Sequence, residues 1–107
     1  MDREKIARTL KNLNQLAIHE VRQHNYARAL EFFIQGLCLE DKLGLKAEMA
    51  ESFFNLASTY YLMEDYEQAL HKIQLSETLF IQEGKGEDLS RARQMEAQIR
   101  MKREGKA

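Results

Sequence analysis

The chain has 107 residues, of which 44% are apolar and 31% charged, a balance typical of one small folded domain with a polar surface. The net charge of −1 gives no electrostatic reason to expect nucleic-acid or anionic-membrane binding. The single cysteine, Cys38, excludes an internal disulfide, and we expect it to pack late in a helix. No apolar stretch approaches the roughly 18 residues of a membrane span, so we expect a cytoplasmic protein.

The chain lacks proline and is rich in strong helix formers, which predicts an all-α fold. In chain order, the spacing of apolar residues predicts helices at residues 3–23, 26–43, 46–63, 66–83 and 87–103. Short polar turns are expected within the helix pairs, at His24-Asn25 and Glu64-Asp65. Glycines that can adopt a left-handed conformation follow the second helix of each pair, at Gly44 and Gly84. Connections this short predict antiparallel neighbours.

A shift of forty residues aligns the first helix pair with the second. Identical residues recur at helix-core spacing, at Leu16/Leu56, Ala17/Ala57, Tyr26/Tyr66, Ala29/Ala69, Leu30/Leu70, Leu39/Leu79 and Gly44/Gly84. Residues 13, 16 and 17, like residues 53, 56, 57 and 60, are expected to form a buried stripe. The recurring alanines predict crossings where two helices approach closely.

The second copy carries Phe53, Leu56, Ala57 and Tyr60 on its first helix and Tyr66, Ala69 and Ile73 on its second. This order resembles the tetratricopeptide repeat (TPR), and the forty-residue period is similar to that of its long-repeat subclass. The resemblance implies a TPR-type α-solenoid of antiparallel helix pairs. It divides a single domain (1–107) into repeat one (3–43), repeat two (46–83) and a closing helix.

Two positions depart from the repeat. Glu20 stands where the second copy has Tyr60, and a carboxylate there is expected to find a polar partner. Residues 87–103 align with the first helix of a third copy, but charged Arg93, Glu96 and Arg100 replace three core positions. The apolar residues that remain, Leu89, Ala92, Met95 and Ile99, are expected to face the preceding pair. This predicts a capping helix, and an array cut after its fifth helix is the alternative.

The first helices of the pairs are expected to line a concave groove, at positions one residue away from the buried stripe. The candidate groove residues are Asn14, Ile18, Val21, Arg22, Glu51, Phe54, Asn55, Ser58, Tyr61, Leu62, Arg91 and Gln94. Phe54, Tyr61 and Leu62 are expected to form one apolar patch. The TPR resemblance implies a ligand-contacting role for the neighbouring Asn55. Apolar pockets beside an amide suit an extended peptide or a helix.

These features predict a protein interaction module, an adaptor or scaffold that binds a protein or peptide partner. The alternative is a structural unit that self-assembles into a homo-oligomer through the groove or an open array end. No nucleophile is placed beside a base, so no enzyme activity, catalytic residue or cofactor is predicted. His19 and His24 lie roughly 140° apart around a helix, so no metal site is expected either.

Overall fold

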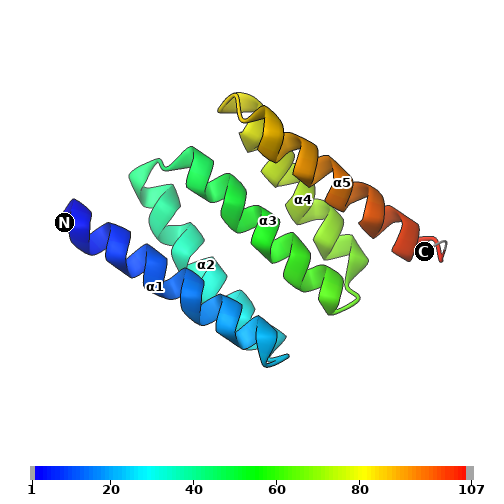
Figure 1. Cartoon of the computed structure of the whole chain (residues 1–107), viewed down its shortest axis with the longest axis horizontal. Helices are drawn as coiled ribbons and strands as arrows, with labels where there is room; N and C mark the ends of the chain where they lie inside the picture. Colours follow the sequence, from blue (N-terminus) through cyan, green and yellow to red (C-terminus); the bar gives the residue numbers. More distant parts are fainter. Residues whose placement is uncertain (1, 106–107) are drawn as a thin grey trace.

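The computed structural model describes residues 2–105, and this part of the chain is all-helical, as predicted (Figure 1). Its five helices run in the order α1 (Arg3–Arg22), α2 (Tyr26–Leu43), α3 (Lys46–Leu62), α4 (Tyr66–Gln82) and α5 (Gly86–Arg103). Each observed boundary lies within one residue of the predicted one. The fold class deduced from composition and apolar spacing is therefore confirmed.

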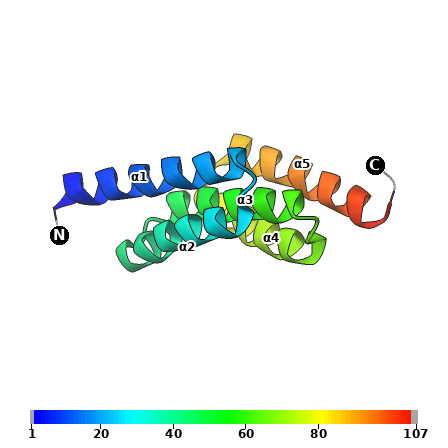
Figure 2. The same cartoon turned by 90° about the horizontal axis from the view of Figure 1, so that it is seen from below.

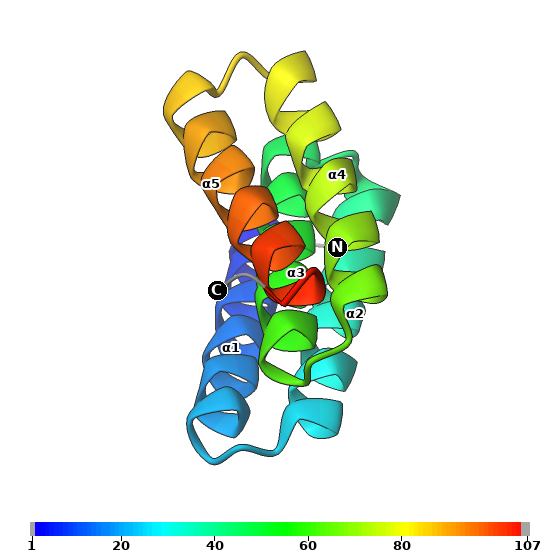
Figure 3. The same ribbon diagram turned by 90° about the vertical axis from the view of Figure 1, so that its right-hand side faces the viewer.

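The helices form two layers, with each helix packed mainly against the next one in the chain. Figure 2 shows α1, α3 and α5 along one side, with α2 and α4 beneath them. The end-on view of Figure 3 shows the same separation, with α1 and α5 on one side and α2 and α4 on the other. Direct packing between α1 and α3 is almost absent, so α2 connects the first pair to the rest.

Two apolar clusters hold the layers together. The first joins α1, α2 and α3 around Ala17, Ala29, Phe33 and Leu56. The second joins α3, α4 and α5 and includes Ala57, Ala69, Ile73, Phe80 and Ile99. The four recurring alanines that were expected at close crossings each have 0% exposure. A larger side chain at any of them would meet a neighbouring helix.

The turns form where the sequence predicted them. Gly44 and Gly84 have φ values of 68° and 66°, in the left-handed region. His24 and Glu64 adopt the same conformation, with φ values of 62° and 63°, although neither is glycine. The Asp65 side chain accepts a hydrogen bond of 3.2 Å from Gln68 N and so caps α4.

Glu20 has the polar contacts predicted for it. Asn25 Nδ2 donates a 2.9 Å hydrogen bond to Glu20 Oε2, and Arg28 Nε lies 3.6 Å from Glu20 Oε1. The carboxylate therefore binds both the turn and the first part of α2. Repeat two has the ring of Tyr60 at the equivalent position.

The fifth helix buries the face predicted for a cap. Ala92 and Ile99 have 0% exposure in the second cluster, and Leu89 and Met95 pack against it. Arg93 and Arg100 are exposed, as expected for a cap. Glu96, the third charged position, is instead half-buried against α4, where Gln74 Nε2 donates to its Oε2 at 3.4 Å.

Two packing expectations were wrong. Leu16 is 46% exposed, whereas its repeat counterpart Leu56 is 1% exposed. The reason is that α2 covers Leu56, but no helix among the described residues lies on the outer side of α1. Cys38 is exposed as well, because its position on α2 points away from both clusters.

Candidate functional site

A groove runs between α1 and α3, and α2 forms its floor. It consists of three adjoining pockets, which we name by their order along α1: the N-terminal, central and C-terminal pockets. Leu10 and Glu48 belong to both the N-terminal and the central pocket. Phe33 and Asn55 belong to both the central and the C-terminal pocket. The shared walls make one continuous groove.

The C-terminal pocket brings together six of the predicted groove residues: Ile18, Val21, Arg22, Asn55, Ser58 and Leu62. Ile18 is 37% exposed and Leu62 is 47% exposed, so this pocket presents apolar side chains to solvent. The amide of Asn55 lies between them and the central pocket. This end of the groove can bury an apolar side chain beside a hydrogen-bonding group.

The N-terminal pocket is also mainly apolar. Its walls come from α1, from the end of α2, from the α2–α3 turn and from the start of α3. They comprise Arg3, Ile6, Ala7, Leu10, Leu43, Leu45 and Glu48. None of these residues was among the candidate groove positions, which lie one residue off the core stripe. Leu43 is 42% exposed, so this end of the groove also presents an apolar side chain to solvent.

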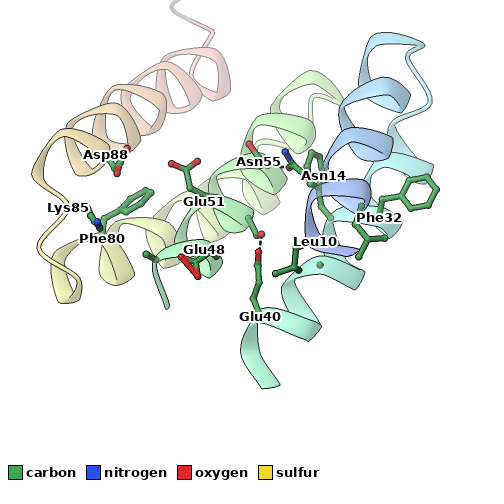
Figure 4. A pocket seen from close by; sticks show the side chains of 15 residues that line it. Leu10, Asn14, Phe32, Glu40, Glu48, Glu51, Asn55, Phe80, Lys85 and Asp88 are labelled. Atoms are coloured by element: carbon green, nitrogen blue, oxygen red, sulfur yellow. Dashed lines mark hydrogen bonds between the residues drawn. The ribbon is translucent and has the colours of Figure 1, made fainter. Parts of the chain in front are cut away.

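The central pocket has a volume of about 380 Å³ and a mixed lining (Figure 4). Leu10, Leu13, Phe32 and Phe33 contribute apolar walls, and the four carboxyl groups of Glu40, Glu48, Glu51 and Asp88 contribute acidic ones. Two predicted residues, Asn14 and Asn55, face each other across the groove. Asn55 Nδ2 donates to Asn14 Oδ1 at 3.4 Å and so connects α3 to α1.

Glu40 is the buried acid of this pocket, and its side chain approaches α3 in Figure 4. It is only 7% exposed, and Ser52 Oγ donates a 2.7 Å hydrogen bond to its Oε1. Burial raises the pKa of Glu40 to about 7, against the opposing effect of the Ser52 hydrogen bond and with the help of nearby Glu48. The forty-residue shift places Glu40 opposite the buried Phe80, and that mismatch could have identified it.

The predicted apolar patch is divided between two surfaces. Leu62 lines the C-terminal pocket, whereas Phe54 and Tyr61 pack against the second cluster, towards α4 and α5. The Tyr61 ring meets that of Tyr66 edge-on, with centroids 5.9 Å apart. Gln94 is exposed on α5 and lines none of the three groove pockets.

Arg91 connects α5 to α3 beside this patch. Arg91 Nη2 donates to Glu51 Oε1 at 2.7 Å and to Asp88 Oδ1 at 3.0 Å, and the guanidinium carbon lies 4.8 Å from the centre of the Phe54 ring. These contacts already occupy Arg91 and one face of Phe54. The part of the groove with free apolar surface is therefore the α1–α3 side.

Among residues 2–105, no helix combines the length and apolarity that crossing a membrane requires. The same residues contain no group of three or more His, Cys, Asp or Glu side chains that could hold a metal ion. The chain matches no known protein-family model, and no curated protein shows significant sequence similarity to it.

Proposed function

We propose that this protein is a TPR-like interaction module, an adaptor or scaffold that binds an extended peptide or a helix of another protein. The observation that carries the proposal is the continuous groove between α1 and α3, which is open to solvent and lined by apolar side chains at both ends. Exposed Ile18 and Leu62 lie next to the Asn55 amide, a combination suited to an apolar anchor and a peptide backbone.

The repeat pattern supports the same proposal. A forty-residue repeat of helix pairs, with small residues at each crossing, resembles the TPR family, whose members bind peptides on the surface formed by the first helices. The predicted Asn14 and Asn55 lie on that surface, where they join across the groove. Fold resemblance alone does not give a partner, so the proposal depends on the groove.

Replacing one groove residue by a charged one tests the proposal. Leu62→Lys places an ammonium in the C-terminal pocket without disturbing the core, because Leu62 is 47% exposed. The matched control is Ile81→Lys on α4, where the replaced side chain is 57% exposed and outside the groove. Proteins that co-purify with the wild type and with Ile81→Lys should be lost with Leu62→Lys. Equal recovery by all three would show that the groove is not the binding surface.

A second candidate function is self-association through the outer face of α1. It is favoured by Leu16, which is 46% exposed although its counterpart Leu56 is 1% exposed. In repeat two that position is covered by a neighbouring helix pair, and a second copy would supply an equivalent cover. Sedimentation over a range of protein concentrations, with Leu16→Lys as the comparison, tests this candidate. A wild type that stays monomeric up to millimolar concentration would exclude it.

A further inference from the structure

The groove changes character along its length, and this change indicates which peptide it fits. Both end pockets are mainly apolar, and the pocket between them is acidic. Building on the function proposed above, we propose that the groove selects a peptide with a lysine or arginine placed between two apolar side chains. The basic side chain enters the central pocket, and the two apolar side chains enter the end pockets.

The central pocket carries an excess of negative charge. Four carboxyl groups line it against one ammonium group, that of Lys85. Arg91 already pairs with Glu51 and Asp88, but within residues 2–105 neither Glu40 nor Glu48 forms a salt bridge. The surrounding segment has the same bias, since residues 46–86 contain seven acidic and three basic side chains.

Glu40 is a buried acid inside the pocket, so the negative charge is not confined to the protein surface. It is 7% exposed, and its hydrogen-bond donor, the Ser52 hydroxyl, is neutral. An ionised carboxylate that is withdrawn from water without a cation is costly, and a ligand cation removes that cost. An anionic side chain in the same place would add repulsion from Glu40 and Glu48.

The walls suit a long basic side chain better than a small cation. Leu10, Leu13 and Phe33 line the same pocket as the carboxyl groups. Lysine and arginine carry an apolar stem that packs along such surfaces while the charged end reaches an acceptor. Gly36 on the floor leaves additional space, because a Cβ atom at this position would have no neighbour within 4 Å.

The length of the groove sets the spacing of the peptide. Ile6 in the N-terminal pocket and Ile18 in the C-terminal pocket are twelve residues apart on α1. At a helical rise of about 1.5 Å per residue they are separated by roughly 18 Å. A peptide in the polyproline II conformation rises about 3.1 Å per residue, so it covers that distance in about six residues and places residues three apart on the same face. The basic residue should therefore lie about three residues from each apolar anchor.

Three labelled synthetic peptides test the inference by fluorescence anisotropy. Each has leucine about three residues to either side of a central position, the spacing that a polyproline II peptide needs. The central position holds lysine, glutamine or glutamate. With the wild type, the lysine peptide should bind about tenfold more tightly than the glutamine peptide. The glutamate peptide should bind most weakly of the three.

Two protein variants locate the selecting groups. Glu40→Gln combined with Glu48→Gln should bring the lysine and glutamine peptides to affinities within about twofold of each other. Glu83→Gln replaces one carboxyl group outside the groove and should leave the preference intact. Gly36→Leu fills the central pocket from its floor and should weaken the lysine peptide most.

The outcomes separate this inference from the function on which it rests. Equal, groove-dependent binding of all three peptides would overturn the charge selection and leave peptide binding in place. Tightest binding of the glutamate peptide would overturn it as well. No binding of any peptide to the wild type, or binding that Leu62→Lys does not reduce, would overturn the proposed groove itself. A dimer that Leu62→Lys abolishes, in a wild type that binds none of the three peptides, would assign the groove to a second copy.

Discussion

The carboxyl groups of Glu77 on α4 and Glu96 on α5 interact across the interface between these two helices. At the equivalent positions forty residues earlier, the chain has Leu37 and Leu56. Leu37 packs against the apolar cluster that contains Leu56. Burial, and then the neighbouring Glu96, raise the pKa of Glu77 to about 7. Burial acts to raise the pKa of Glu96 too, but hydrogen bonds from Glu77, Arg100 and Gln74 outweigh it and lower that pKa. A proton held by Glu77 therefore joins the two acids.

We expect the free energy of unfolding to fall as pH rises from about 4.5 to about 7. Glu77 and Glu40 each have a folded-state pKa of about 7, above the ordinary value of 4.5 for this side chain. In this window the folded chain keeps protons that the unfolded chain has released, so rising pH favours unfolding. The lowered pKa of Glu96 acts below this window. Urea unfolding between pH 4.5 and 8 should show a combined loss of about 1–3 kcal/mol.

The control for this pH dependence is Glu83→Gln, the same substitution at an exposed position outside both clusters. Glu77→Gln and Glu40→Gln should each flatten the pH dependence, and the double variant should flatten it most. A wild-type stability that rises steadily from pH 4.5 to 7 would contradict the assignment of raised pKa values to these two acids.

Glu77→Leu should stabilise the protein by about 1–2 kcal/mol at pH 8. The Oε2 atom of Glu77 is buried and receives no hydrogen bond from the described residues, so an apolar side chain removes an unsatisfied group. The gain should shrink at pH 5, where Glu77 is protonated and donates to Glu96. Chemical denaturation at the two pH values measures the difference, and a gain that is equal at both would argue against the shared proton.

Ala57 and Ala69, the two buried alanines at the α3–α4 crossing, should not tolerate a larger side chain. Ala57→Leu should cost about 1–3 kcal/mol, because Ala57 has 0% exposure against α4. Ala97 is its counterpart forty residues later and is exposed, so Ala97→Leu should change the stability by less than about 0.5 kcal/mol. Thermal unfolding of both variants tests the comparison.

Backbone conformation provides a further prediction at the turns. Glu64 has a φ of 63°, which costs an L-residue with a Cβ atom about 1 kcal/mol or more. Glu64→Gly should therefore stabilise by a few tenths of a kcal/mol up to about 1 kcal/mol, the greater freedom of glycine in the unfolded chain offsetting part of the gain. Gly84→Ala, at a φ of 66°, should destabilise by about 1 kcal/mol. Calorimetry that shows the same sign for both changes would refute the explanation.

The helices and turns were predictable from local spacing and turn residues, and the buried alanines from matches between the two copies. Leu16 was not, because an identical residue has different neighbours at the end of an array. Glu40 was overlooked because matches were compared, whereas the informative feature was its mismatch with Phe80. The position of the groove also depends on the separation of α1 and α3, which cannot be read from the sequence of either helix. Leu62 therefore faces the groove on the α1 side, whereas Phe54 packs against the second cluster.

The scarcity of packing between α1 and α3 has a thermodynamic consequence. The first helix is supported almost entirely by α2, so its amide hydrogens should exchange through openings that leave α3, α4 and α5 folded. A ligand lying in the groove would add contacts between α1 and α3, which are few in the chain itself. Occupancy would then slow exchange along the whole of α1, and affinity and local order at this end of the protein would be two measures of the same equilibrium.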